Sequence, residues 1–300
     1  MPRAATLWLV VAVGVLSISA AAPLIKSCTD APAVVIAAAR LGIASCLLLP
    51  AAGLVRGRRV WQVPPSAGKY IILAGVFLAA HFLLWMTSLK YTSVVSSVVI
   101  VTTNPMFVGI ASYFLFKERI RRGLVVGIVL AFGGGALIAL ADTRTPHGGS
   151  SLYGDLLALG GAVMASCYWL AGRKVRSQVD ALTYVTGVYA VAAVILVGTM
   201  LALGHGFGGY RNETYVYFVL LAVVPQLLGH SAFNWAIKHI SATRIAVFIL
   251  GEPIGAGILA YAFLEESVGR LQGLGSGLIL LGIVLAASGG SQTCPSGKPA

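Results

Sequence analysis

Long apolar runs alternate with short polar, glycine-bearing or proline-bearing breaks along the whole chain. Each run holds about 20 residues, the length that an α-helix needs to cross the hydrocarbon core of a bilayer. Strands of a membrane barrel would give segments of about ten alternating residues, and the chain shows no such alternation. The pattern predicts an all-α integral membrane protein without an attached soluble domain. Its ten expected transmembrane helices cover residues 6–25, 33–55, 69–89, 92–116, 123–141, 152–172, 181–204, 215–237, 242–264 and 268–289.

The first run has a second interpretation, a cleavable signal peptide. Arg3 precedes the run, and Ser19, Ala20 and Ala21 resemble a cleavage site. Removing the run would leave nine spans and would disturb the charge pattern and the internal repeat described below. We therefore expect a membrane helix here.

Composition supports a membrane-embedded chain. Hydrophobic residues make up 58% of it and charged residues only 10%, whereas a soluble domain carries about 25% charged residues. So little polar surface excludes a cytosolic enzyme, a secreted disulfide scaffold and a disordered chain.

The positive charges orient the expected helices. The net charge is +12, a surplus that can indicate nucleic-acid binding. Of the 21 Lys and Arg residues, however, 15 fall on the side of the N-terminus and 5 on the opposite side, while Arg40 lies inside the second span. Cytoplasmic loops of membrane proteins concentrate Lys and Arg. The bias predicts that both termini are cytoplasmic and requires no nucleic-acid partner.

The chain contains an internal repeat. At an offset of 148 residues, the stretch 90–139 falls on 238–287, which pairs the fourth span with the ninth and the fifth with the tenth. Each half therefore holds five spans, and because five is odd the halves cross the membrane in opposite directions. Such inverted repeats are typical of secondary transporters, whose substrate site lies near the midplane between the repeats. We expect residues 1–142 and 143–290 to form the two five-helix repeats, followed by a cytoplasmic tail at 291–300.

Each half closes with the same motif, P-x3-G-I-x2-Y-x4-E-x3-R-x4-G, from Pro105 through Gly127 and from Pro253 through Gly275. Over roughly residues 6–289 the chain resembles the EamA-type permeases of the drug/metabolite transporter superfamily. Arg40 within the second span and the Glu252–Pro253 pair are also similar to that family. The resemblance implies a ten-span transporter that exports amino acids, drugs or other metabolites, and no motif selects among these substrates.

Two charged residues lie deep in the expected membrane. At 1.5 Å per residue, Arg40 is about 10 Å below the outer end of its span, and Glu252 is about 15 Å above the inner end of its own. In a core of about 30 Å their depths differ by only about 5 Å, so an ion pair is possible in height. In the functional interpretation, Arg40 binds an anionic substrate group and Glu252 binds a proton or a cationic group. In the structural one, the two form a pair or cap loose backbone.

Polar residues also form stripes on two spans. Gln226, His230 and Asn234 follow one another at intervals of four, and His81 and Trp85 share a face of the third span. A polar stripe on an apolar helix must face protein or water. Because the third and eighth spans correspond in the two repeats, we expect a shared substrate pathway. Hydrogen bonding between helices is the alternative explanation.

Prolines mark the fourth and ninth spans. Pro105 and Pro253 occupy corresponding mid-span positions, preceded by Asn104 and Glu252. Each proline removes a backbone donor, so each is a candidate hinge, with a static kink as the alternative. Small-residue ladders in the fifth and tenth spans predict close helix contact; they comprise Gly123, Gly127, Ala131, Gly135, Gly269, Gly273 and Gly277. The aromatic pair Tyr168 and Trp169 is expected at the membrane interface.

No enzyme chemistry is expected. The four cysteines, Cys28, Cys46, Cys167 and Cys294, form no CxxC motif or Cys/His cluster, so we expect neither a metal site nor a cofactor. The spans carry no paired nucleophile and base and no two deep carboxylates, so no catalytic residue is expected.

Together these features predict an inner-membrane permease that moves small polar metabolites, such as amino acids, outward by alternating access. Its partners would be a small-molecule substrate and the lipid bilayer. A proton-coupled exporter of drugs or other cationic compounds, with Glu252 as the titrating carboxylate, is the nearest alternative. An intramembrane enzyme or a channel is the alternative from another class.

Overall fold

A computed structural model describes residues 4–57, 62–116, 122–142, 151–175, 178–236, 249 and 251–288. Within these residues all regular secondary structure is helical. The first half of the chain forms α1 (Ala4–Ser19), α2 (Ala21–Ser27), α3 (Ala33–Arg56), α4 (Pro65–Ser88), α5 (Val94–Val101), α6 (Asn104–Phe116) and α7 (Arg122–Asp142). The second half forms α8 (Ser151–Val175), α9 (Ala181–Ala202), α10 (Asn212–Leu221), the π-helix η2 (Ala222–His230), α11 (Ser231–Ala236), α13 (Gly251–Leu264) and α14 (Arg270–Ser288).

The ten expected spans all contain helical residues, which confirms the all-α fold. Among the described residues, seven helical segments are long and apolar enough to cross a membrane: Ala5–Ser27, Ala33–Arg56, Pro65–Ser88, Val94–Leu115, Leu152–Val175, Ala181–Ala202 and Asn212–Phe233. Three shorter apolar helices account for the fifth, ninth and tenth spans: Val125–Ile138, Gly251–Leu264 and Arg270–Leu285. The expected start of the ninth span lies outside the described residues apart from residue 249, and the expected tail at 291–300 lies wholly outside them.

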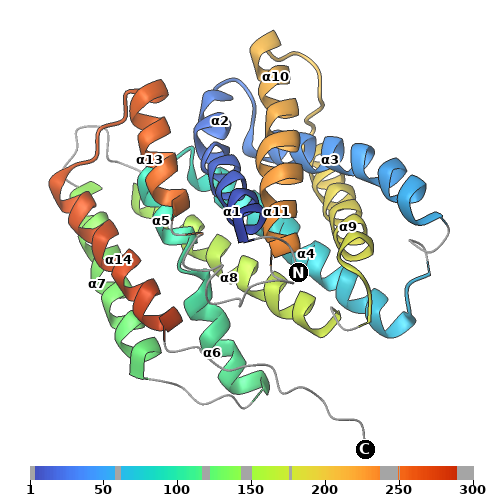
Figure 1. The fold of residues 1–300 in the computed structure, drawn as a ribbon. Helices are drawn as coiled ribbons and strands as arrows, with labels where there is room; N and C mark the ends of the chain where they lie inside the picture. Colours follow the sequence, from blue (N-terminus) through green and yellow to red (C-terminus); the bar gives the residue numbers. More distant parts are fainter. Residues whose placement is uncertain are drawn as a thin grey trace, which may run out of the picture.

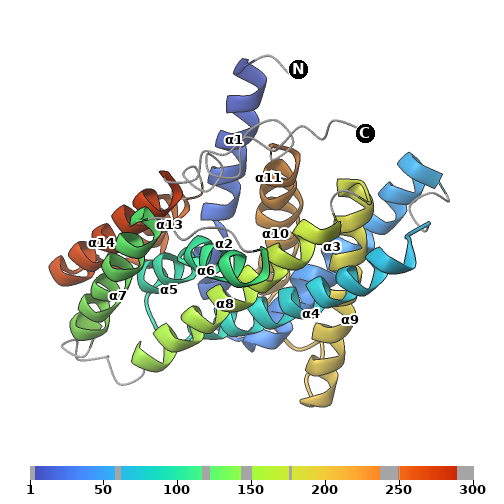
Figure 2. The same ribbon diagram turned by 90° about the horizontal axis from the view of Figure 1, so that it is seen from below.

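The helices pack in a pattern that is symmetric between the two halves. The third span, α4, packs on the sixth, α8, and correspondingly the first span, α1, packs on the eighth, η2. The second span packs on the seventh (α3 on α9), and the fifth on the tenth (α7 on α14). Figures 1 and 2 show α7 and α14 side by side at one edge of the molecule, away from α3 and α9. Each pair of packed spans therefore has an equivalent pair when every span is replaced by its counterpart in the other half, as expected for a repeat.

The contact between α7 and α14 reveals the relative direction of the repeats. A Cβ placed on Gly134 would lie against the Gly275 carbonyl oxygen, and one placed on Gly282 would lie 2.6 Å from the Gly127 carbonyl oxygen. The residue numbers rise along α7 as they fall along α14, so the two helices are antiparallel. Gly127 and Gly275 are repeat counterparts, as are Gly134 and Gly282. Antiparallel counterparts confirm the inverted repeat.

The prediction that the small-residue ladders of the fifth and tenth spans form the close helix contact was only partly correct. Gly123 and Gly127 do meet α14, at the carbonyl oxygen of Leu285 and at Gly282. A Cβ on Gly135, Gly269 or Gly277, however, would meet nothing within 4 Å. The rotation of α14 about its own axis decides which glycines enter the contact. The spacing of glycines along a glycine-rich sequence leaves that rotation ambiguous.

The fourth span is interrupted beside its proline. Helix α5 ends at Val101 and α6 begins at Asn104, which places Pro105 in the first turn of α6, where a missing N–H group costs little. The break interrupts the regular i→i+4 hydrogen bonds, and the Ile100 carbonyl accepts instead from the Thr103 N–H group, at 3.1 Å. The hydroxyl groups of Thr102 and Thr103 donate to the carbonyls of Val99 and Ile100, at 2.8 and 2.7 Å. Local side chains thus satisfy backbone groups for which lipid offers no partner.

Candidate functional site

Arg40 lies fully buried in α3, between the two repeats. Its Nε donates a 2.7 Å hydrogen bond to Oε1 of Gln226, which η2 contributes from the second half. The Arg40 guanidinium carbon also lies 4.4 Å from the centre of the Phe82 ring on α4. The Gln226 amide oxygen and the face of the Phe82 ring compensate part of the free-energy cost of removing this charge from water. The hydrocarbon core of a membrane offers no such partners.

Helix α4 supplies an aromatic platform beneath the guanidinium group. The Trp85 ring lies 6.0 Å from the Arg40 guanidinium carbon and stacks on the His81 ring, with an interplanar angle of 9°. His81 Nδ1 lies 2.9 Å from the Gly161 carbonyl oxygen of α8, the geometry of a donated hydrogen bond. That bond assigns the proton to Nδ1 and holds the ring in one orientation. The interval of four residues between His81 and Trp85 places both rings on this face.

The π-helical geometry of η2 brings two more polar residues to the same place. Pro225 lies inside η2, where it removes a backbone donor and favours a widened turn. Gln226 is fully buried against Arg40, and the His230 ring meets the edge of Phe82 at a centroid distance of 6.4 Å. The Gln226–His230 stripe therefore faces protein. The third stripe residue, Asn234, belongs to α11, and its side chain lies outside the described part of the structure.

Tyr189 and Phe82 were missed by the sequence pattern. Tyr189 of α9 is almost completely buried, beside Gln226 and within electrostatic reach of Arg40. A tyrosine in the middle of an apolar span was the available signal, because its hydroxyl group needs a partner there. Tyr168, expected at the membrane interface, packs inside the protein: it is buried and stacks on Tyr184 at a centroid distance of 6.4 Å. Its depth in the membrane stays a prediction.

Glu252 approaches this group of residues from α13. It is electrostatically coupled to Arg40, yet among the described residues no ion pair within 4.0 Å joins the two. Its backbone carbonyl accepts a 3.4 Å hydrogen bond from the Ser19 hydroxyl group. The direct ion pair left open by the sequence does not form, since Gln226 takes that place beside Arg40. We name Arg40, His81, Phe82, Trp85, Tyr189, Gln226, His230 and Glu252 the Arg40 cluster.

The remaining candidates make other contacts. Asn104 begins α6, and its backbone carbonyl accepts a 2.9 Å hydrogen bond from Ser166 of α8. Within the described residues, no hydrogen bond or ion pair joins Asn104 to the Arg40 cluster. Pro253 is buried in the first turn of α13 and lines an apolar groove between α5, α13 and α14. The side chain of Pro105 lies outside the described part of the structure.

Three side-chain nitrogens of the Arg40 cluster are unused hydrogen-bond donors. Arg40 Nη1, Trp85 Nε1 and Gln226 Nε2 have no partner within the part of the chain that the structure describes. Burying an unpaired donor costs about 1–3 kcal/mol, more when it is charged. Three such donors in one cluster, one of them cationic, suit an acceptor group with negative charge. In the described ranges, no three His, Cys, Asp or Glu side chains are placed to hold a metal ion.

Comparison with known proteins agrees with this architecture. The sequence profile of the EamA-like transporter family matches residues 5–140 and 152–288, one match in each half. A transporter of uncharacterised function from Bacillus subtilis, YyaM, is 28% identical over 84% of this chain and 83% of its own length. A probable terminal-alkyne amino-acid exporter from Streptantibioticus cattleyicolor is 23% identical over 82% of this chain and 81% of its own length.

One crystal structure has a similar fold. It superposes with a TM-score of 0.65 over 95% of this chain and 97% of the other, at 20% sequence identity. At that identity the likeness concerns the arrangement of the helices alone.

Proposed function

Because the chain belongs to the EamA-like transporter family, we propose that it exports small polar metabolites, such as amino acids, by alternating access at the Arg40 cluster. One observation carries this proposal: side chains from both inverted repeats converge on a buried guanidinium group that keeps an unused donor. Transport by an inverted-repeat protein requires a site that both halves share. Arg40 and Trp85 from the first half and Gln226, His230 and Glu252 from the second supply it.

The chemistry of the cluster favours a substrate with a carboxylate group. A carboxylate can accept from Arg40 Nη1 and Trp85 Nε1 together, which satisfies two of the unused donors of the cluster. Glu252, coupled to Arg40 but not paired with it, would remain available for an ammonium group on the same substrate. A zwitterion would then leave the net charge of the site unchanged, whereas a simple anion or cation would add an uncompensated charge.

The proposal includes a location and a moving unit. The bias of basic residues toward one side supports insertion in the inner (plasma) membrane with both termini in the cytoplasm. The two five-helix repeats, residues 1–142 and 143–290, would rock against each other around the cluster.

A substrate panel on purified protein in liposomes tests the proposal. Amino acids, other carboxylates, cationic dyes and sugar phosphates would be offered with and without a pH gradient. We expect amino acids to be transported and Arg40→Lys to raise the half-saturating concentration by about tenfold or more, because the planar bidentate donor is lost. Arg56→Lys, on an exposed arginine at the end of α3, is the matched control. Transport of dyes alone, unaffected by Arg40→Lys, would refute the proposed substrate class.

The nearest alternative, a proton-coupled exporter of cationic compounds, rests on Glu252. No ion pair between Arg40 and Glu252 is present in the described residues, so Glu252→Gln should not strand a buried partner charge. In this alternative, the Glu252→Gln protein keeps its thermal stability. It loses uphill transport driven by a proton gradient but still exchanges substrate across the membrane. Unchanged transport and unchanged pH dependence in Glu252→Gln would exclude it.

A further inference from the structure

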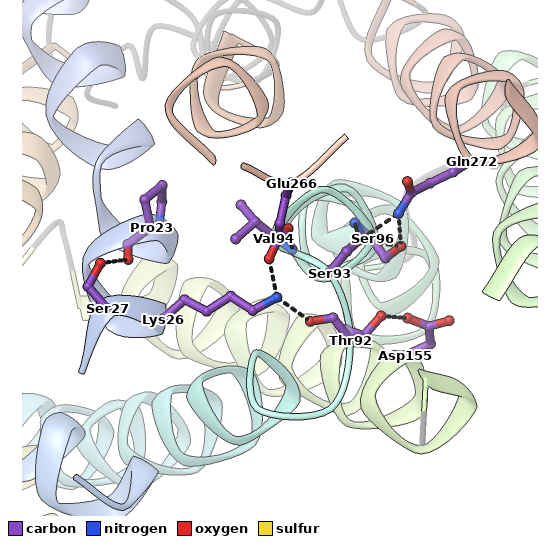
Figure 3. A network of polar contacts seen from close by, with 10 residues as sticks. All are labelled: Pro23, Lys26, Ser27, Thr92, Ser93, Val94, Ser96, Asp155, Glu266 and Gln272. Carbon is purple, nitrogen blue, oxygen red and sulfur yellow. Dashed lines mark hydrogen bonds and ion pairs between the residues drawn. The ribbon is translucent and has the colours of Figure 1, made fainter. Parts of the chain in front are cut away.

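A network of polar side chains joins the elements at the end of the bundle where α2 finishes (Figure 3). The Lys26 ammonium group forms an ion pair with Oε1 of Glu266 and donates a 3.1 Å hydrogen bond to the Thr92 carbonyl oxygen. The other carboxylate oxygen of Glu266 accepts a 2.9 Å hydrogen bond from the Val94 N–H group. One glutamate thus binds a lysine on the first span and the N-terminus of α5 together.

Further hydrogen bonds extend the network to two more helices. The Thr92 hydroxyl group donates to Oδ1 of Asp155 on α8, at 2.9 Å. The Gln272 amide of α14 donates to the hydroxyl groups of Ser93 and Ser96, the latter at 2.8 Å. Figure 3 shows these residues arranged around the turn that precedes α5.

Most of these contacts cross between the two halves of the chain. Lys26, Thr92 and Val94 belong to the first repeat, while Asp155 and Glu266 belong to the second. Rocking of one repeat against the other changes contacts between the halves while those inside a half persist. The network is therefore compatible with only one of the two end states of the transport cycle, the one closed at this end.

The Lys26–Glu266 pair is well suited to hold that state. The two side chains are only 28% and 22% exposed, so salt and water screen the pair less than a surface pair.

The pair also has a counterpart in the sequence. At the 148-residue offset, Lys26 corresponds to Lys174 and Glu266 to Glu118. Glu118 lies outside the described residues. The two residue types recur at equivalent positions of both halves, which favours a role in the repeat architecture over a local surface contact.

We infer that Lys26 and Glu266 form a gate lock that closes this end of the substrate pathway and separates once in each transport cycle. The inference rests on the proposed alternating access at the Arg40 cluster. Glu266 is a positioning residue: it holds the N-terminus of α5 and α2 together and does not contact the substrate.

Thiol labelling tests the lock without a known substrate. A single cysteine replaces His230 in a protein whose four native cysteines are replaced, and a membrane-impermeant thiol reagent is added from each side of proteoliposomes in turn. We expect Glu266→Gln to raise the labelling rate from the Lys26 end about fivefold, the change that corresponds to ~1 kcal/mol for one ion pair. Labelling from the opposite end should fall, because the two open states compete.

A charge exchange separates the two roles of Glu266. In the double variant Lys26→Glu with Glu266→Lys the ion pair can form again, but a lysine cannot accept the hydrogen bond from the Val94 N–H group. We expect labelling between that of the parent and that of Glu266→Gln.

The control is Glu213→Gln, which removes an exposed carboxylate at the same end of the bundle, at the start of α10. It should leave both labelling rates unchanged. An equal rise from both sides in Glu266→Gln would indicate a loosened fold and overturn the lock, as would no change from either side. A reporter that stays unlabelled from both sides in the parent and in every variant would instead refute the proposed pathway, and the lock with it.

Discussion

At the scale of single residues, the Arg40 cluster combines satisfied and unsatisfied groups. Arg40 Nε is bonded to Gln226 and His81 to the Gly161 carbonyl, so both side chains are held in one orientation. Arg40 Nη1, Trp85 Nε1 and Gln226 Nε2 have no partner among the residues that the structure describes. A transporter needs both properties, because preorganised groups give selectivity while unused donors give the substrate something to bind.

Trp85→Phe tests the unused indole donor. The substitution keeps an aromatic ring beside Arg40 and removes a buried N–H group that lacks a partner in the described structure. We expect the thermal stability of the empty protein to change by less than about 1.5 kcal/mol in free energy, since the lost packing is offset by the removed donor. Substrate affinity should fall about tenfold, as for one lost hydrogen bond. Binding measured by calorimetry and melting measured in detergent check both parts, and equal affinity would exclude the donor.

At the scale of helices, glycine and proline decide how closely neighbours approach and where helices are interrupted. Pro225 lies in the π-helical turn that carries Gln226 and His230, and Pro105 lies in the first turn of α6, after a break in the fourth span. The glycines of α7 and α14 bring two backbones into contact. These features concentrate irregular backbone inside the protein, where hydroxyl groups and neighbouring helices can satisfy it.

Gly134→Ala tests the contact between α7 and α14. The added methyl group would collide with the Gly275 carbonyl and lie 2.8 Å from Ile279 Cγ1. We expect a loss of about 1–3 kcal/mol in the free energy of unfolding, the usual cost of overpacking. Gly133→Ala, one residue earlier, meets nothing within 4 Å and is the matched control. If both variants melt at the same temperature, the two helices do not pack in this register.

The turn between α2 and α3 is tied to α10 by a pH-dependent contact. Asp30 accepts hydrogen bonds from the Thr214 hydroxyl group at 2.6 Å and from the Arg211 N–H group at 2.7 Å, and these hold the pKa of Asp30 below its ordinary value of 3.8. Because the folded pKa is the lower one, the contribution to stability is present above the ordinary value and is lost as the pH falls through the folded pKa. Asp30→Asn should therefore melt below the parent at neutral pH, and the difference should shrink in acid. A difference that is constant from neutral pH to acid would contradict this link.

At the scale of the whole molecule, the two halves share their helix pairings and meet as antiparallel counterparts at α7 and α14. The Arg40 cluster lies between the halves, and the Lys26–Glu266 network joins them at one end. Exchange between two arrangements of similar units is the physical basis of alternating access, because each arrangement can close one side.

Reporter fusions test the orientation of the bundle. The distribution of basic residues predicts cytoplasmic signals for fusions after Arg58, Arg121 and Arg176, and external signals after Thr145 and Arg211. The first four of these positions lie outside the described residues, so the measurement concerns topology alone. An external signal at any of the three expected cytoplasmic positions would overturn the ten-span orientation.

The sequence alone determined the helical class, the ten spans and the repeat, because each depends on local composition and period: an apolar run of sufficient length must become a helix in lipid. It also selected Arg40, His81, Trp85, Gln226, His230 and Glu252, since polar groups in apolar spans need partners. Only the tertiary structure decided which partner each one takes. Gln226 rather than Glu252 lies against Arg40, Phe82 and Tyr189 complete the cluster, and the Asn104 carbonyl accepts a hydrogen bond from Ser166. These choices follow from the rotation and lateral packing of helices, which depth and spacing along one chain leave undetermined.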